Sequence, residues 1–121
     1  MAAGTTAAAG DMPGRGAMAA GGRTLTISGG HVWVDASGDG LDVNGSVTMS
    51  GGTLLVNGPT NNGNGALDYD GDLQITGGLL LAVGSGGMAQ APDTTSTQST
   101  IMVTLPSAQP GGTLFSLFNE A

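Results

Sequence analysis

Short runs of alternating apolar and polar residues recur along the middle of the chain. In the first pair of runs, Leu25 and Ile27 alternate with threonines, and Val32 and Val34 alternate after a double glycine. Period-two alternation is typical of strands that bury one face. The pattern therefore predicts short strands, of about four to six residues each, joined by glycine turns.

The double glycines return at regular intervals. They occupy positions 29–30, 51–52 and 77–78, which are 22 and then 26 residues apart. A repeat of this length indicates a solenoid, in which one supersecondary unit is stacked on the next. We therefore predict an all-β fold, a parallel β-helix or solenoid of about three to four coils. Right-handedness is the general preference of parallel crossover connections.

A third short strand is expected in each coil. Leu41 and Leu67 occupy equivalent positions, and so do Val43 and Tyr69, because both pairs are 26 residues apart. In a parallel stack, equivalent residues lie about 4.8 Å apart on neighbouring strands. The third strand would therefore align the two acidic, glycine-rich stretches that surround these residues.

The composition changes along the chain and divides it into three parts. Residues 1–22 are mostly Ala, Gly, Met and Pro, and we interpret them as a loop or linker. Residues 23–90 carry the repeats. Residues 91–121 depart from the spacing and are expected to form a degenerate last coil or cap, with strands at 101–105 and 114–118. We interpret the whole as a piece of a longer protein.

The positions that point outward also repeat. Trp33, Leu55 and Leu81 follow successive double glycines by the same number of residues, and Phe115 follows Gly111-Gly112 in the same way. These four residues predict an apolar stripe on the outer surface. Because large exposed apolar patches are uncommon on monomers, one interpretation is that another segment, such as the N-terminal loop, covers the stripe. The other is a surface for sugar stacking or self-association.

The charge of the chain is strongly negative and excludes some partners. Nine acidic residues stand against two arginines and no lysine, for a net charge of −7. Such a chain repels phosphate backbones and anionic lipids, so we expect neither nucleic acid nor membrane partners. Because cysteine is absent, disulfides and thiolate metal sites are excluded.

The acidic stretches predict a calcium site. The 26-residue offset places Asp42 over Asp68 and Asn44 over Asp70, about 5 Å apart in a parallel stack. Carboxylates this close disfavour joint ionisation, so they favour a shared proton or a bound cation. Oxygen ligands on flexible glycine-rich turns suit Ca²⁺. The candidate ligands are Asp39, Asp42, Asn44, Asn64, Asp68 and Asp70. The alternative is that Asp-Gly and Asn-Gly are ordinary turn formers.

Residues 25–92 resemble a known family. The matching phrases are Thr26-Ile27-Ser28-Gly29-Gly30, Ser37 to Gly45, Val56 to Gly71 and Gly84 to Pro92. They are similar to secreted bacterial carbohydrate-binding proteins, which are right-handed parallel β-helices of the pectate-lyase type. The resemblance implies a secreted or cell-surface protein that binds calcium and polygalacturonate-like polysaccharide. It also implies calcium at Asp39, Asp42, Asp68 and Asp70.

Three functions of different classes remain open. The first is calcium-dependent, non-catalytic binding of acidic polysaccharide, with Asp42, Asp68, Asp72 and Trp33 as the ligand contacts. The second is a structural solenoid that assembles end to end through open strand edges, with calcium in a stabilising role. The third is a glycosidase, which would use two of the acidic side chains. A lyase is not favoured, because no basic residue lies near the acidic turns.

Overall fold

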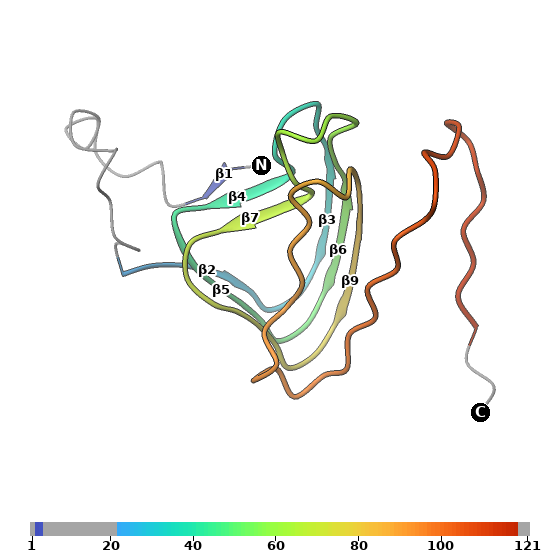
Figure 1. The fold of residues 1–121 in the computed structure, drawn as a ribbon. Coiled ribbons are helices and arrows are strands. Elements are labelled where there is room, and N and C mark those ends of the chain that lie inside the picture. The colour runs from blue at the N-terminus through green and yellow to red at the C-terminus, as the bar shows by residue number, and fades with distance from the viewer. Residues whose placement is uncertain (1, 4–21, 119–121) are drawn as a thin grey trace, which may run out of the picture.

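The computed structural model describes residues 2–3 and 22–118, which form nine strands in three parallel sheets (Figure 1). No helix occurs in this part of the chain, so it contains none able to cross a membrane. The predicted fold class is confirmed at the level of an all-β protein with parallel strands in stacked sheets. The order in which the chain visits the three sheets is compatible with a β-solenoid.

The three sheets are called A, B and C. Sheet B contains three strands in parallel register. They are β2 (Arg23–Ile27), β5 (Gly45–Met49) and β8 (Leu73–Ile75). Val47 pairs with Leu25 on one side and with Leu73 on the other. The strands form where the sequence alternates, because the apolar positions all face the same interior.

Sheet C follows the glycine turns. It contains β3 (His31–Asp35), β6 (Thr53–Asn57) and β9 (Leu79–Val83), in that order. The register aligns Trp33 with Leu55 and Leu55 with Leu81, which confirms three members of the predicted apolar stripe. Most of residues 1–22, the segment expected to cover it, lie outside the described residues.

Sheet A is the narrowest and carries the acidic residues. It contains β1 (Ala2–Ala3), β4 (Leu41–Val43) and β7 (Leu67–Tyr69), with β4 in the centre. The third strand per repeat, predicted from the matching leucines, is confirmed. Strand β1 was not predicted from the sequence, because two adjacent alanines show no alternation of polar and apolar residues.

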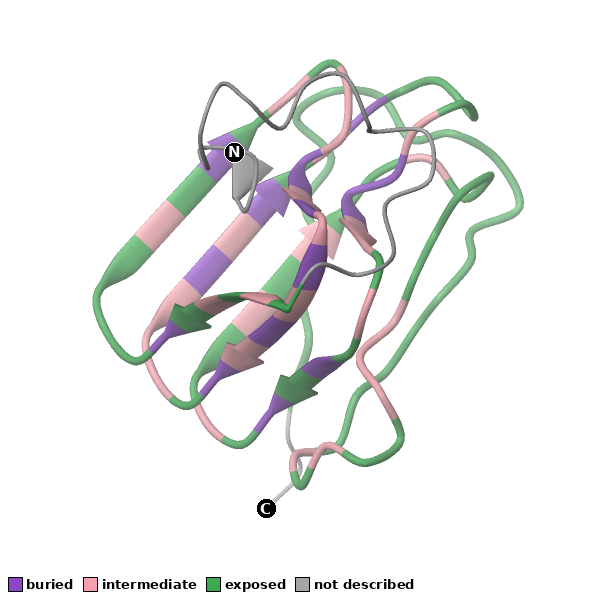
Figure 2. Ribbon diagram, turned by 90° about the vertical axis from the view of Figure 1, so that its left-hand side faces the viewer, coloured by how far each residue is buried: buried purple, intermediate pink, exposed green. Residues whose placement is uncertain are grey.

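The core lies between the three sheets and is entirely apolar. Figure 2 shows the buried residues alternating with more exposed ones along the strands. Leu41, Val47, Met49 and Leu54 are each only 1% exposed, and no polar or charged residue is buried among the described residues. Burying an aliphatic side chain of this size contributes about 1.5–3 kcal/mol, so the interior supplies the main force for stacking.

The corners between sheets B and C explain the double glycines. The second glycine of each pair has a positive φ, 77° at Gly30, 87° at Gly52 and 91° at Gly78. Stacking adds a second constraint, because a Cβ on Gly52 would lie 2.7 Å from the carbonyl carbon of Gly29. The backbone conformation therefore favours glycine at all three corners, and at Gly52 and Gly78 the space also excludes a side chain.

Residues 90–98, which we call the edge segment, run along the outer edges of β7 and β8 without forming a strand. Asp93 shows the mode of contact. Its Oδ2 accepts a hydrogen bond from the Leu73 N–H at 2.9 Å, and its own N–H donates to the Leu73 carbonyl at 2.8 Å. Side chains thus satisfy backbone groups that a further strand would otherwise pair.

The two strands expected in the last part of the chain are not formed. Residues 101–105 and 114–118 have no strand assignment, and all of them are exposed. The expected strands were inferred from alternation alone, and alternation does not produce a strand without a paired neighbour. Phe115 accordingly does not extend the apolar stripe.

Candidate functional site

Two aspartates of neighbouring strands stand directly one above the other in sheet A. Asp42 lies in the middle of β4 and Asp68 in the middle of β7, and they are register partners. Their neighbours Leu41 and Leu67 are buried, so alternation turns both aspartates to the outer surface. The predicted alignment of these two residues is therefore confirmed, and we call them the acidic pair.

The acidic pair is electrostatically strained. Partial burial is the largest cause that raises the pKa of Asp42, and the charges of Asp39 and Asp70 raise it further. The pKa of Asp68 is raised in the same way, first by burial and then by Asp39, Asp42 and Asp70. Both effects penalise the ionised form. A proton or a cation at this place is therefore favoured over two bare carboxylates.

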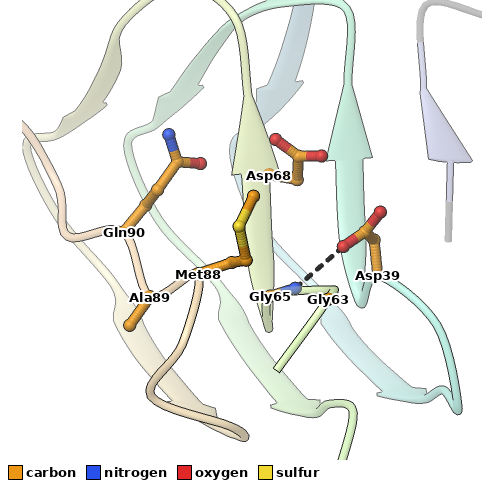
Figure 3. A pocket seen from close by; sticks show the side chains of 7 residues that line it. All are labelled: Asp39, Gly63, Gly65, Asp68, Met88, Ala89 and Gln90. Carbon is orange, nitrogen blue, oxygen red and sulfur yellow. Dashed lines mark hydrogen bonds between the residues drawn. The ribbon is translucent and has the colours of Figure 1, made fainter. Parts of the chain in front are cut away.

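Asp39 lies in the loop before β4 and connects the two acidic stretches. Its Oδ1 accepts a hydrogen bond from the Gly65 N–H at 2.8 Å, as Figure 3 shows. Gly65 has no room for a side chain, because a Cβ would lie 2.7 Å from the Met88 carbonyl oxygen. The close packing of these loops thus fixes the Asp39 carboxylate beside the acidic pair.

A shallow hollow of about 290 Å³ lies next to Asp39 and Asp68. In Figure 3 the side chain of Gln90 lies on the other side of β7 from the carboxylates of Asp39 and Asp68. Met88 lies between Gln90 and these carboxylates. The lining residues are Asp39, Gly63, Gly65, Asp68, Met88, Ala89 and Gln90. The hollow therefore combines acidic groups with a polar amide and one thioether.

Asn44 and Asp70 continue the ladder beyond the ends of β4 and β7. The Asp70 N–H donates to the Val43 carbonyl at 3.2 Å, which extends the register and sets Asp70 opposite Asn44. Asp70 is exposed and Asn44 is half-buried. The charge of Asp70 acts on both members of the acidic pair.

Asn64 belongs to a separate network in the loop before β7. Its amide donates to Asn61 Oδ1 at 3.0 Å, and the same oxygen accepts the Gly63 N–H at 3.1 Å. The Asn61 amide in turn donates to the Ser37 carbonyl at 3.3 Å. This loop therefore uses asparagines in the way expected of ordinary turn formers.

The predicted ligand contacts do not all share one face. Asp72 precedes β8 in sheet B, and its N–H donates to Ser46 Oγ at 3.2 Å. Trp33 lies in sheet C, with 78% of its surface exposed. Only Asp42 and Asp68 of the four predicted contacts lie in sheet A.

The acidic face supplies a hard-ion donor set but not a closed cage. Its side-chain donors are carboxylate oxygens, which suit Ca²⁺. Within the described residues, no group of three or more Asp, Glu, His or Cys side chains is arranged to hold a metal ion. Asp42 and Asp68 alone would leave most of the six to eight oxygen ligands of a calcium ion to other groups.

Several residues of the hollow were not predicted from the sequence. Gln90 is the most informative, because its Oε1 accepts the Tyr69 N–H at 3.0 Å beside the acidic strand. Met88 and Ala89 reach the hollow because the edge segment and the residues before it fold back over β7. These residues belong to the phrase Gly84 to Pro92, which carried part of the family resemblance, but no internal repeat marks them as site residues.

Comparison of the chain with family models, curated proteins and solved structures gave no match.

Proposed function

We propose that this chain binds acidic polysaccharide of the polygalacturonate type through Ca²⁺, without cleaving it. The observation that supports this is the register pairing of Asp42 with Asp68, together with the raised pKa of both. A cation beside the acidic pair offsets the mutual repulsion of the carboxylates. The adjoining hollow offers a place for a ligand group next to the ion.

The ion would join the protein to the polysaccharide. Ca²⁺ takes six to eight oxygen ligands, and Asp42 and Asp68 supply only some of them. Uronate carboxylates and water would supply the others. This arrangement accounts for how a chain of net charge −7 holds a polyanion. It also means that ion and polysaccharide strengthen each other's binding, because each completes the site for the other.

The finer fold assignment belongs to the same proposal. We infer a right-handed parallel β-helix of about three to four coils, of the pectate-lyase type, in a secreted or cell-surface protein. The sequential visits to sheets B, C and A support the coiled arrangement. The handedness rests on the general preference of parallel crossovers, and the location rests on the family resemblance.

The test is isothermal titration of the protein with oligogalacturonate, in calcium and in EDTA. We expect heat of binding in calcium and loss of most of it in EDTA. Titrations of calcium into the oligosaccharide alone measure the heat of calcium binding to the free polymer, and this heat is subtracted. Asp42→Asn and Asp68→Asn should each weaken binding at least tenfold, which corresponds to about 1.4 kcal/mol.

The matched control is Asp35→Asn. Asp35 lies in sheet C, and an asparagine there keeps an oxygen to accept the hydrogen bond from Asn57. This variant removes the same charge from another face and should bind normally. Equal weakening in all three variants, or binding that EDTA does not affect, would contradict the proposal. Release of new reducing ends would favour the glycosidase instead.

A further inference from the structure

Strand β9 leaves an open edge at one end of sheet C. It is the last strand of its sheet, and all five of its residues are apolar. The outward residues Leu79, Leu81 and Val83 are 56%, 41% and 53% exposed. The edge segment covers the corresponding edges of β7 and β8, and β9 is an edge strand that a further strand could extend.

Gln98 fixes where the next strand of sheet C belongs in the chain. Three residues at the end of sheet B make equivalent backbone hydrogen bonds to the strand before them. The N–H···O bonds run from Ser50 to Ile27 at 2.9 Å, from Thr76 to Met49 at 2.8 Å, and from Gln98 to Ile75 at 3.2 Å. The Gln98 side chain also donates to the Gly78 carbonyl at 3.0 Å, directly at the corner.

The equivalence of these residues identifies an unpaired strand sequence. A sheet C strand begins three residues after Ser50 and three residues after Thr76. Counted in the same way from Gln98, the next strand is Ile101–Leu105, with Val103 opposite Leu81. The four apolar residues of this segment are each at least 49% exposed. The segment forms no strand.

Thr100 explains why the segment does not pair with its own β9. It stands where the preceding corner has Gly78, whose φ is +91°. A β-branched residue is a steric outlier at such a φ, and no described non-glycine residue has a positive φ. Space is short as well, because a Cβ on Gly78 would lie 2.7 Å from the Gly52 carbonyl oxygen. The chain therefore leaves the body of the molecule after this corner (Figure 1).

We propose that Ile101–Leu105 of a second copy of this chain adds to the edge of β9 as a parallel strand. Pairing between copies avoids the turn that Thr100 prevents within one copy. It also removes two exposed apolar surfaces from water, the outer residues of β9 and the incoming segment. Strand addition of this kind derives affinity from backbone hydrogen bonds and specificity from alternate side chains.

The proposed contact differs from end-to-end stacking of whole molecules. The edge segment covers the outer edges of β7 and β8, so within the described residues sheet C is the sheet whose strand edge is left uncovered at this end. Reciprocal exchange of the segment would close a dimer, whereas one-way exchange would continue from copy to copy. The contact is independent of the proposed polysaccharide site, which lies in sheet A.

Cysteine pairing tests the proposed register, because the chain has no cysteine of its own. Two full-length proteins, Leu81→Cys and Val103→Cys, are mixed in a thiol redox buffer. Neighbouring parallel strands are about 4.8 Å apart, which is within the range a disulfide spans. We expect a covalent dimer that contains one chain of each variant. Leu81→Cys mixed with Thr104→Cys is the matched control, since position 104 would face the opposite side.

The outcomes show whether the strand that pairs with β9 comes from a second copy or from the same chain. Absence of the 81–103 cross-link, or equal cross-linking of the 81–104 control, would overturn the proposal. A monomer cross-linked internally, in the double variant Leu81→Cys/Val103→Cys or Leu81→Cys/Phe115→Cys, would also overturn it. Replacing Ser99 and Thr100 by glycine should restore the corner and abolish the dimer. A dimer unaffected by that change would contradict the role given to Thr100.

Discussion

Asp39 and Gly65 are joined across the repeat by a hydrogen bond from the Gly65 N–H to Asp39 Oδ1, at 2.8 Å. The two residues are 26 positions apart, the same offset that aligns Asp42 with Asp68. Asp39 therefore holds the two acidic loops in register, and its charge also raises the pKa of both members of the acidic pair. One side chain combines a structural role with an electrostatic one.

Replacing Asp39 separates these two roles. Asp39→Ala removes the acceptor for the Gly65 N–H, and loss of a hydrogen bond to a charged group costs about 1.5–3 kcal/mol. Asp39→Asn keeps an oxygen acceptor but removes the charge, so it should restore most of the stability. Urea unfolding of the three proteins measures the difference. Equal losses in both variants would show that the charge, and not the hydrogen bond, stabilises the loops.

The acidic pair predicts a dependence of stability on pH. The pKa values of Asp42 and Asp68 are raised in the folded protein, so the folded state binds more protons than the unfolded chain between the ordinary and the raised pKa. The free energy of unfolding therefore falls as the pH rises through that interval, and the penalty remains at neutral pH. Thermal unfolding in EDTA between pH 3 and pH 7, which spans the ordinary carboxyl pKa of about 4, should show this decline.

A substitution in the acidic pair tests the origin of that decline. Asp68→Asn removes one of two like charges directly opposite each other, which should stabilise the metal-free protein at neutral pH by roughly 0.2–1 kcal/mol. It should also flatten the pH profile. Asp35→Asn is the control, because Asp35 lies in sheet C and Asp68 in sheet A. If the Asp68→Asn variant is less stable than the unsubstituted protein in EDTA, the proposed repulsion between Asp42 and Asp68 is contradicted.

The sequence was sufficient to predict the stacking, because stacking is periodic. Leu54 and Leu80 both follow a double glycine at the same distance, and they are indeed register partners. The same kind of offset, 26 residues, predicts the pairing of Asp42 with Asp68. Periodic features can be read from one chain because every repeat must present its apolar face to the same interior.

The edge segment could not be predicted, because its contacts occur only once. Residues 91–121 are predicted only as a degenerate last coil or cap, whereas the Asp93 carboxylate and Ser96 Oγ accept the N–H groups of Leu73 and Ile75. The sequence also favoured Gly112 as the next corner, since it follows another glycine. The hydrogen bond of Gln98 shows that Thr100, and not Gly112, holds the position equivalent to the corner glycines Gly52 and Gly78. A corner without glycine carries no signal in the composition.

The edge segment should make a measurable contribution to stability. Asp93→Ala leaves the Leu73 N–H without its carboxylate partner, in a residue that is 2% exposed. We expect a loss of about 1–3 kcal/mol in the free energy of unfolding, the usual cost of a buried unpaired donor. Asp93→Asn, which keeps an acceptor, should recover part of it. Thr94→Ala at the exposed neighbouring position should change stability by less than about 0.5 kcal/mol.

The corner glycines allow backbone strain to be separated from stacking. Gly30 and Gly52 both have a positive φ, 77° and 87°, so alanine at either position costs about 1–2 kcal/mol in backbone strain. Only at Gly52 does the neighbouring repeat add a clash, because a Cβ would lie 2.7 Å from the Gly29 carbonyl oxygen. Around Gly30 there is nothing within 4 Å of that position. Gly52→Ala should therefore be clearly less stable than Gly30→Ala in urea unfolding. Equal losses would mean that the repeats do not stack closely at their corners, and the register that places Asp42 beside Asp68 would then need another explanation.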